Sequence, residues 1–415
     1  MNIYAVIIIA ALLADFVLNI VADVLNLRMI RTELPDLFKD HHSPESYGKS
    51  QEYLRVNTRF NWVTSTVNLG VVLAFWFAGG FNYLDQAVRH LNFGPVLSGV
   101  LFIGILAAGK ALVSLPFTVY DTFVIEEAFG FNKTTVKTFI ADTVKGVLLA
   151  LAIGAPLLSV ILLFFQVLGA YAWITCWVTV VVFMLIMQIL VPTVIMPLFN
   201  RFEPIEDGEL KKALMDYAAA IRFPLTQVFR MDGSKRSSKS NAFFTGFGKS
   251  KRIVLFDTLI EQHTVPELVG VLAHEMGHFK LNHIKKTLCI AVLQSGAMFY
   301  ILSLCLSRQG LFDAFYMEHM SVYAGLVFFG LLFAPVDFFT NILMNMYSRK
   351  NEYEADRFAV TTTHDNRSLK EALIKLSVNN LGNLFPHPFY VLLNYSHPPL
   401  MDRIERIENT VVSTG

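Results

Sequence analysis

Apolar residues are concentrated in seven runs along the chain, and each run is long enough to cross a lipid bilayer. The runs cover residues 3–26, 62–84, 96–120, 144–168, 171–197, 287–307 and 321–346. A helix that spans a bilayer needs about 20 predominantly apolar residues, and all seven runs meet that length. The pattern therefore predicts a multi-pass membrane protein with seven transmembrane helices.

Polar residues gather between and after these runs and divide the chain into four parts. The parts are 1–197 with the first five transmembrane helices, 198–286, 287–346 with the last two, and 347–415. Within 198–286 three short β-rich runs, Gln227–Asp232, Asn241–Phe247 and Arg252–Leu259, predict a small antiparallel sheet.

A helix is predicted to follow this sheet. Thr264 and Glu267 have the spacing of a capping box, and Pro266 falls inside the first turn. Apolar positions then continue at helical period. The second polar segment is predicted to be helical from about Ser348 and is punctuated by prolines towards its end.

Composition agrees with a membrane protein and excludes other classes. The chain is 54% hydrophobic and 16% charged, whereas soluble domains carry roughly 25% charged residues. Composition alone would still fit an unusually apolar soluble protein, but the seven long apolar runs exclude a soluble globular or intrinsically disordered chain. A net charge of +1 gives no reason to expect a nucleic-acid partner.

The distribution of Lys and Arg predicts the orientation in the membrane. Short loops 27–61 and 127–143 hold six and two of these residues, whereas the alternate loops hold only Arg89 and Arg308. Because basic residues favour the cytoplasmic side, the N-terminus is expected outside and the C-terminus in the cytoplasm. The membrane would be the inner membrane in a bacterium and the endoplasmic reticulum in a eukaryote.

His274-Glu275-Met276-Gly277-His278 lies on the capped helix. Histidines at i and i+4 project from one face, so both rings can reach one metal ion, while Glu275 is rotated by about 100° and can meet an attacking water. This spacing is typical of zinc peptidases. It predicts His274 and His278 as zinc ligands and Glu275 as the general base.

A catalytic zinc site needs a third protein ligand and one open position. The longer pattern HExxHxxGxxH is excluded, because its last Gly and His positions hold Leu281 and Ile284. His283 would fall on a different face of a continuing helix, and we interpret it as a solvated or structural histidine.

A carboxylate-rich helix directly after the last apolar run supplies a better third ligand. Glu352 and Asp356 are four residues apart and share a face. The spacing predicts that Glu352 binds the metal while Asp356 accepts a hydrogen bond from the free ring N–H of a ligand histidine. Two spans separate His278 from Glu352, so the chain returns to the side of the membrane that it left.

The ordered set of motifs resembles the type 1 CAAX prenyl proteases, a family of seven-span zinc metallopeptidases of the gluzincin type. The motifs are EEAFGFNKT at 126–134, PLFNRF at 197–202, SNAFF at 240–244, HEMGH at 274–278, EYEAD at 352–356, and SHPP at 396–399 with Arg403.

This resemblance implies one Zn²⁺ per chain, held by His274, His278 and Glu352, with Glu275 as the general base. It matches His397 and Arg403 to family positions that help to hold the scissile carbonyl or the developing oxyanion.

The resemblance also implies a mainly α fold. Seven transmembrane helices would form a barrel around a large water-filled chamber, with a small α+β gluzincin-like metalloprotease domain on the cytoplasmic side. Polar residues in or beside the spans give a reason for such a chamber, and their pairing within a dry bundle is the alternative. These residues are Lys110, Asp121, Asp337, Asn341 and Asn345.

The run at Asn241, Ala242, Phe243 and Phe244 is a candidate substrate-binding strand. As an edge strand it would pair with an extended peptide backbone, a mode that tolerates many sequences. Ordinary packing within the sheet is the alternative.

The expected activity is removal of the C-terminal aaX tripeptide from isoprenylated CaaX proteins by an integral-membrane zinc endopeptidase. In a bacterium without prenylation, the same site would cleave misfolded membrane proteins. A second enzyme class, the smaller heat-shock-induced membrane zinc protease, shares the HExxH sequence, but its smaller number of spans argues against it. A transporter with a structural zinc would need a fourth protein ligand, and none is evident. The expected partners are a peptide or protein substrate and the lipid bilayer, and the chain is expected to be a monomer.

Overall fold

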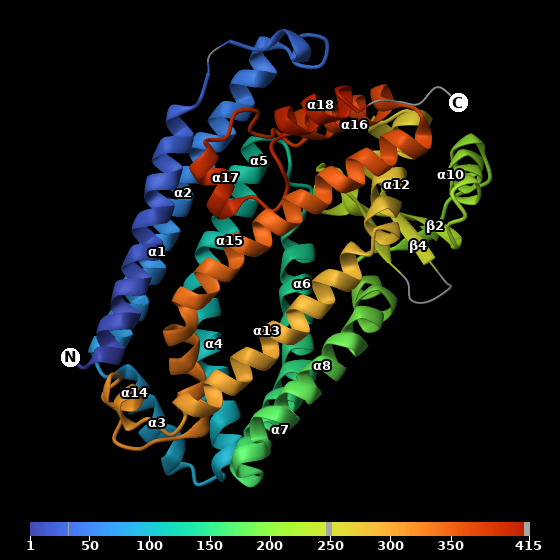
Figure 1. Cartoon of the computed structure of the whole chain (residues 1–415). Helices are drawn as coiled ribbons and strands as arrows, with labels where there is room; N and C mark the ends of the chain where they lie inside the picture. Colours follow the sequence, from blue (N-terminus) through green and yellow to red (C-terminus); the bar gives the residue numbers. More distant parts are fainter. Residues whose placement is uncertain (32, 246–250, 411–415) are drawn as a thin grey trace.

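The computed structural model describes residues 1–31, 33–245 and 251–410 (Figure 1). Within them, seven helical segments are long and apolar enough to cross a membrane, which confirms the predicted number. Four of them are uninterrupted helices: α1 (Ile3–Arg28), α2 (Pro44–Phe77), α13 (His283–Cys305) and α15 (Val322–Thr363).

The other three segments each contain one π-helical turn. They are α4 (Pro95–Tyr120) joined through Asp121–Ile125 to α5 (Glu126–Ala128), α6 (Val136–Leu149) joined through Ala150–Gly154 to α7 (Ala155–Val167), and α8 (Ala172–Leu190) joined through Val191–Ile195 to α9 (Met196–Phe199). Pro156 follows the second turn and Pro192 lies in the third. Because proline cannot donate the regular helical hydrogen bond, the helix widens locally at these places.

The second span ends earlier than the apolar pattern predicts. Gly79 adopts φ 72, a left-handed conformation that terminates α2 at Phe77. The chain then turns into a separate helix, α3 (Gly80–His90), which lies with α14 (Gln309–Asp313) at the end of the bundle that holds the N-terminus (Figure 1).

The spanning helices are arranged as a helical barrel, in which few residues of each span are fully buried (Figure 1). Between 0% and 33% of the most apolar window of each segment is buried inside the protein. A dry seven-helix bundle would bury the inner face of every helix. Lys110, Asp337 and Asn341 are exposed within their spans, so they are not packed against one another.

A four-stranded sheet follows the fifth span. Its strands are β1 (Phe202–Pro204), β2 (Leu225–Met231), β3 (Ala242–Thr245) and β4 (Lys251–Phe256), in the order β1-β2-β4-β3. The predicted purely antiparallel sheet is wrong, because β2 and β4 are parallel while β3 and β4 are antiparallel. The sequence between β2 and β4 is long enough for the crossover that parallel strands require. Gly246 and Phe247 of the predicted strand lie outside the described residues.

Burial explains why β4 is central. Ile253, Val254 and Leu255 are all buried, so both faces of this strand are covered. An uninterrupted apolar run of this kind is typical of a strand with neighbours on both sides and cover on both faces. The shorter β3 is consequently left at the edge.

The helices that pack around this sheet are α10 (Glu209–Ala220), α11 (Asp257–Gln262), α12 (Val265–Lys280), α16 (Asn366–Asn379) and α18 (Leu400–Glu408). The short helix α17 (Pro388–Asn394) lies instead against α1 and α15. Leu272 and Met276 of α12 share one core with Leu255 of β4 and Ala359 of α15. The helix with the HExxH sequence is therefore fixed between the sheet and the end of the last spanning helix.

The predicted capping box at the start of α12 is confirmed. The Glu267 carboxylate accepts a hydrogen bond of 2.9 Å from the backbone N–H of Thr264, and Thr264 caps the third residue in return. Lys375 of α16 also donates to Glu267 at 2.7 Å. These bonds fix the start of α12.

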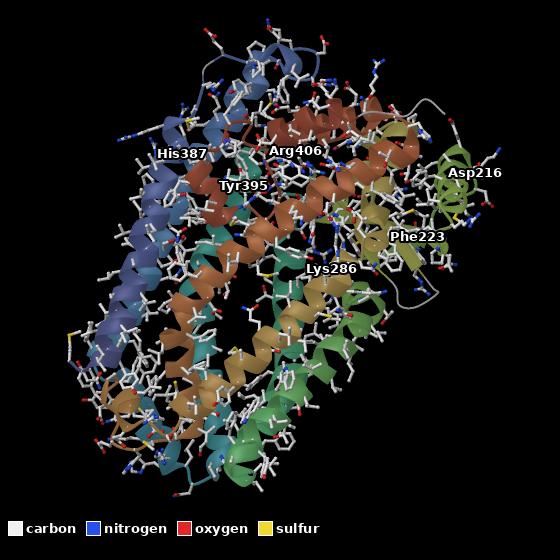
Figure 2. The ribbon with its side chains drawn as sticks, viewed as in Figure 1. Asp216, Phe223, Lys286, His387, Tyr395 and Arg406 are labelled. Carbon is white, nitrogen blue, oxygen red and sulfur yellow. The ribbon has the colours of Figure 1, made fainter. Side chains whose placement is uncertain are left out.

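The C-terminal segment contacts both the last spanning helix, α15, and the first, α1. Arg406 of α18, labelled in Figure 2, places its guanidinium 3.5 Å above the ring of Tyr353 in α15. The backbone N–H of His387 donates to Asn26 of α1 at 3.0 Å.

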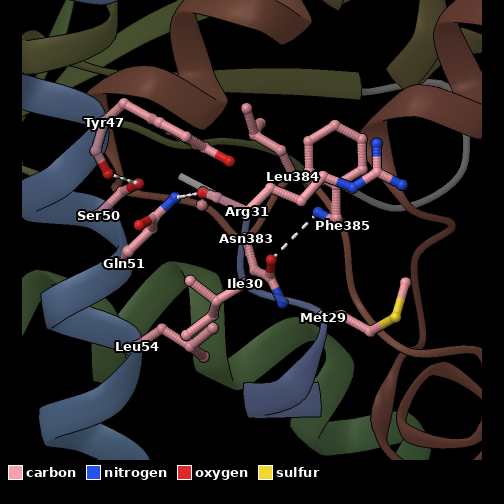
Figure 3. A pocket seen from close by; sticks show the side chains of 11 residues that line it. Met29, Ile30, Arg31, Tyr47, Ser50, Gln51, Leu54, Asn383, Leu384 and Phe385 are labelled. Carbon is pink, nitrogen blue, oxygen red and sulfur yellow. Dashed lines mark hydrogen bonds between the residues drawn. The ribbon is translucent and has the colours of Figure 1, made fainter. Parts of the chain in front are cut away.

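A narrow pocket marks the junction between the C-terminal segment and the connection from α1 to α2. Figure 3 shows Arg31 beside Phe385, and the guanidinium lies 4.2 Å above that ring. Gln51 of α2 donates to the backbone carbonyl of Arg31. The C-terminal segment is thus held against the first two helices.

Candidate active site

Three metal-binding side chains meet where α12 crosses α15. The Nε2 atoms of His274 and His278 are 3.1 Å apart. Glu352 of α15 places Oε2 3.4 Å from His274 Nε2 and Oε1 3.3 Å from His278 Nε2. The long helix α15 is continuous from the membrane-spanning part into this site, as the sequence predicts beyond Ser348.

These donors fit a divalent cation. Ligand atoms about 2.05 Å from a tetrahedral ion are separated by roughly 3.3 Å, close to the distances between the three side chains. Within the described residues, Glu352 Oε2 is buried and makes no hydrogen bond. A buried carboxylate oxygen without a donor is costly unless a cation is its partner.

Asp356 and Arg403 support the ligand His274 from behind. Asp356 Oδ1 lies 2.8 Å from His274 Nδ1. Arg403 donates from Nε and Nη2 to the two Asp356 oxygens at 2.8 and 2.7 Å. All three side chains are buried, so each charge has its partner inside the protein. The sequence predicts the Asp356 contact, whereas the bidentate pair with Arg403 is visible only in the fold.

The environment of His274 makes its ring a stronger metal ligand. Burial alone would lower its pKa, but the neighbouring carboxylates, above all Asp356 at its Nδ1, raise the pKa to about 9. A histidine held by a carboxylate at its other nitrogen is a more basic ligand with a fixed ring orientation.

Glu275 follows His274 on α12 and is half-buried. Among the residues that the structure describes, no side chain forms an ion pair or hydrogen bond with its carboxylate. The group is therefore free to accept a proton from a water molecule beside the three ligands.

His397 lies on the open side of the cluster, in the loop between α17 and α18. Its side chain is 67% exposed, and its Nε2 is 3.5 Å from Glu352 Oε1. Ser396 Oγ lies 3.1 Å from the other ring nitrogen. The histidine can therefore contact a bound molecule without rearrangement of the core.

The candidate strand, with Asn241 just before β3 and Ala242 to Phe244 within it, lies at the sheet edge, and β3 contacts α12. The ring of Phe244 packs against Phe223 and Phe279, with ring centroids 5.5 and 5.8 Å away (Phe223 is labelled in Figure 2). Phe243 faces Phe256 at 6.3 Å. Side-chain packing thus holds β3 at the edge of the sheet.

Sequence reasoning missed one pair of residues beside the ligands, His283 and Glu354. α12 ends at Lys280, and Asn282 adopts φ 58 before α13 begins, so the helix does not continue as assumed. The break turns His283 back towards His278, with 3.1 Å between their Nδ1 atoms. Placing His283 on a different face of one helix was therefore wrong. The signal in the sequence is Asn282, since asparagine tolerates the left-handed conformation that ends a helix.

A second missed group ties the 126–134 motif to the sheet domain. Lys239, just before β3, pairs with Glu126 at 2.8 Å and donates to Tyr53 of α2 at 2.9 Å. Asn132 forms an isolated antiparallel bridge with Ser237. The loop after the third span thus supports the segment that leads into β3.

Comparison with known proteins agrees with this arrangement. Residues 23–201 match the family model described as the CAAX prenyl protease N-terminal region with five membrane helices, and residues 204–411 match peptidase family M48. CAAX prenyl protease 1 of Saccharomyces cerevisiae is 34% identical, over 92% of this chain and 90% of that protein. The Arabidopsis thaliana homolog of CAAX prenyl protease 1 is 36% identical, over 88% of each chain.

A solved structure gives the same result for the fold. The crystal structure of S. mikatae Ste24p superposes with a TM-score of 0.93 at 33% identity, over 98% of this chain and 100% of that one. Two family models that together span most of the chain, relatives above 30% identity and this fold lead to one conclusion. The chain belongs to the CAAX prenyl proteases of peptidase family M48 and is a multi-pass membrane metallopeptidase.

Proposed function

We propose that this protein is a zinc endopeptidase that removes the C-terminal aaX tripeptide of isoprenylated CaaX proteins. The observation that carries the proposal is the meeting of His274, His278 and Glu352, with the orphaned Glu352 Oε2 at its centre. Two histidines and one glutamate are a ligand set of catalytic zinc sites, which keep one position open. The names of the yeast and plant relatives support the substrate class.

The chain's own residues divide the chemistry between them. Zinc bound to the three ligands would supply a Lewis acid for the scissile carbonyl and the attacking water. Glu275 takes the proton of that water and later delivers it to the leaving amine. His397 donates a ring N–H to the oxygen on which negative charge develops.

Arg403 contributes differently from His397. Two of its N–H groups are already bonded to Asp356, and its Nη1 lies 3.6 Å from Glu352 Oε2. We infer that its charge stabilises the oxyanion at short range while its fork holds Asp356 against His274.

The substrate backbone would lie along β3. As an edge strand of the sheet, β3 would offer main-chain donors and acceptors to an extended peptide. Because β3 contacts α12, such a peptide would pass beside the ligand histidines.

The proposal includes an orientation and an oligomeric state. The excess of Lys and Arg in loops 27–61 and 127–143 supports a cytoplasmic active site and C-terminus, with the N-terminus outside. All proposed catalytic residues come from one chain, which supports a monomer. The membrane would be the endoplasmic reticulum in a eukaryote and the inner membrane in a bacterium.

The test uses the purified full-length protein in detergent. Zinc content is measured first, and then cleavage of one CaaX peptide in farnesylated and non-farnesylated form. We expect about one zinc per chain and cleavage before the last three residues of the farnesylated peptide. Equal cleavage of both forms would overturn prenyl specificity and leave a general membrane protease. Absence of zinc would overturn the metal site.

A further inference from the structure

The ligand His278 has a support of its own, separate from the one behind His274. His283 places Nδ1 3.1 Å from His278 Nδ1, and its Nε2 lies 3.1 Å from Glu354 Oε2. The His283 side chain is 3% exposed, whereas Glu354 is 40% exposed and has Lys350 3.8 Å from its other oxygen. The four groups form a line from the metal site to the surface.

The line has only one arrangement of protons that suits a metal ligand. His278 must keep the Nε2 lone pair free for the ion, so its Nδ1 carries the hydrogen and donates. His283 Nδ1 then accepts, which leaves the hydrogen on His283 Nε2. That nitrogen donates to Glu354, and an ionised carboxylate can only accept.

We propose that His283 and Glu354 are positioning residues that hold His278 in its metal-binding tautomer and ring orientation. The inference rests on the proposed metal site. It pairs with the known geometry on the other side: Asp356 supports His274 directly, whereas Glu354 supports His278 through an intervening imidazole.

Two other roles for His283 fit the geometry less well. A fourth ligand would have to approach Nε2 of His278 and His274, but His283 contacts the opposite nitrogen of His278. A histidine that only starts α13 would not need a partner on α15, yet Glu354 belongs to that helix. The helix break at Asn282, with φ 58, is what brings His283 between the two.

The primary measurement is metal affinity of the purified full-length protein, by competition with a zinc chelator. His283→Leu removes the acceptor and should weaken zinc binding by about 10- to 100-fold, the usual effect of losing such a support. In His283→Asn, Oδ1 stands the same number of bonds from Cβ as Nδ1, so we expect recovery of most of the affinity. Glu354→Leu should cause a smaller loss, because it acts one step further from the ligand.

His263 provides a matched control. It is also a buried histidine of this domain, 8% exposed, and within the described part of the chain its ring nitrogens lie at hydrogen-bond distance from the backbone carbonyls of Leu259 and Ala372. His263→Leu should lower the unfolding temperature without a change in zinc affinity of the folded protein. An equal loss of affinity in His263→Leu and His283→Leu would overturn the proposal, since the effect would then be general destabilisation.

Cobalt substitution gives a second measurement, and a purely structural role of His283 would leave its result unchanged. The visible absorption of bound Co²⁺ reports ligand geometry, so His283→Leu should change the spectrum and His283→Asn should restore it. Wild-type zinc affinity in both His283→Leu and Glu354→Leu would overturn the positioning chain alone. Failure of the wild-type protein to bind zinc would instead overturn the proposed metal site. If His283→Leu does not fold, Glu354→Leu carries the test, because its side chain reaches the surface.

Discussion

Gly277 faces Ala355 where the HExxH helix crosses the end of the last spanning helix. A Cβ atom on Gly277 would stand 3.2 Å from Ala355 Cα and 3.3 Å from its carbonyl oxygen. Both residues lie inside the motifs that carry the ligands, between His274 and His278 on α12 and between Glu352 and Asp356 on α15. The close approach of the two backbones therefore sets the distance across the metal site.

Substitution of Gly277 by Ala is expected to push α15 away from α12 by a few tenths of an ångström. Because Glu352 moves with α15, zinc affinity should fall about tenfold or more. Chelator competition measures this change. Gly48→Ala in α2 is the control, since a Cβ there meets nothing within 4 Å and should stabilise that helix slightly. Unchanged zinc affinity in Gly277→Ala would show that the close approach of the two helices does not set the geometry of the metal site.

Glu275→Gln should retain zinc and lose peptide hydrolysis. The amide keeps the shape of the side chain but cannot take a proton from water, and general acid–base catalysis contributes about 10²- to 10⁴-fold to the rate. Zinc analysis and turnover of a farnesylated peptide are measured on the same preparation. Wild-type turnover in this variant would falsify the assignment of the base.

His397→Ala should lower kcat while leaving zinc content and thermal stability unchanged. The side chain is largely exposed and forms no part of a core, so its loss creates no cavity. Removal of one oxyanion donor costs about 10²- to 10³-fold in other hydrolases. A loss of zinc in parallel with activity would contradict this role and indicate a contribution to metal binding.

Arg403→Leu should destabilise the protein as well as impair zinc binding. It leaves the Asp356 carboxylate, 2% exposed, without its bidentate partner. Removing one member of a buried ion pair costs about 3–5 kcal/mol. The double variant Arg403→Leu/Asp356→Asn should recover part of that loss, because it removes the unpaired charge as well. Thermal unfolding of the wild type, the two single variants and the double variant measures the coupling between Arg403 and Asp356. Additive effects would disprove the pairing.

Asp365, in the turn after α15, should make the stability of the folded protein depend on pH. Burial alone would raise the pKa of Asp365, but hydrogen bonds from Ser368 and the backbone of Arg367 lower it below 3.8. A carboxylate whose pKa is lower in the folded state stabilises the folded protein at pH values above its unfolded-state pKa. This stabilisation is lost as the pH falls through the folded-state pKa. Asp365→Ala should therefore cost about 1 kcal/mol at neutral pH and less at pH values below the folded pKa.

Asp365→Asn is the matched variant for that effect, because asparagine caps helices about as well as aspartate. It should keep the capping hydrogen bonds and lose the acid dependence. The same acid dependence in Asp365→Asn and in the wild-type protein would place its origin elsewhere.

The sequence alone determined the features that depend on neighbouring residues. Runs of about 20 apolar residues specify the seven spans, because the bilayer offers no other partner for exposed backbone groups. The capping box of Thr264 and Glu267 specifies the start of α12, and the four-residue spacing of His274 and His278 places both rings on one face. Glu352 could be named in advance because it shares its helix face with Asp356 and lies two crossings after His278.

The tertiary structure decided everything that depends on contacts between distant segments. The parallel pairing of β2 with β4, the approach of Gly277 to Ala355 and the pairing of Arg403 with Asp356 join residues whose spacing along the chain carries no periodic signal. The position of His283 was misjudged because one left-handed residue, Asn282, breaks a helix whose pattern could have continued. Local spacing fixes which side chains share a face, whereas the packing of α12 between the sheet and α15 fixes what those faces meet.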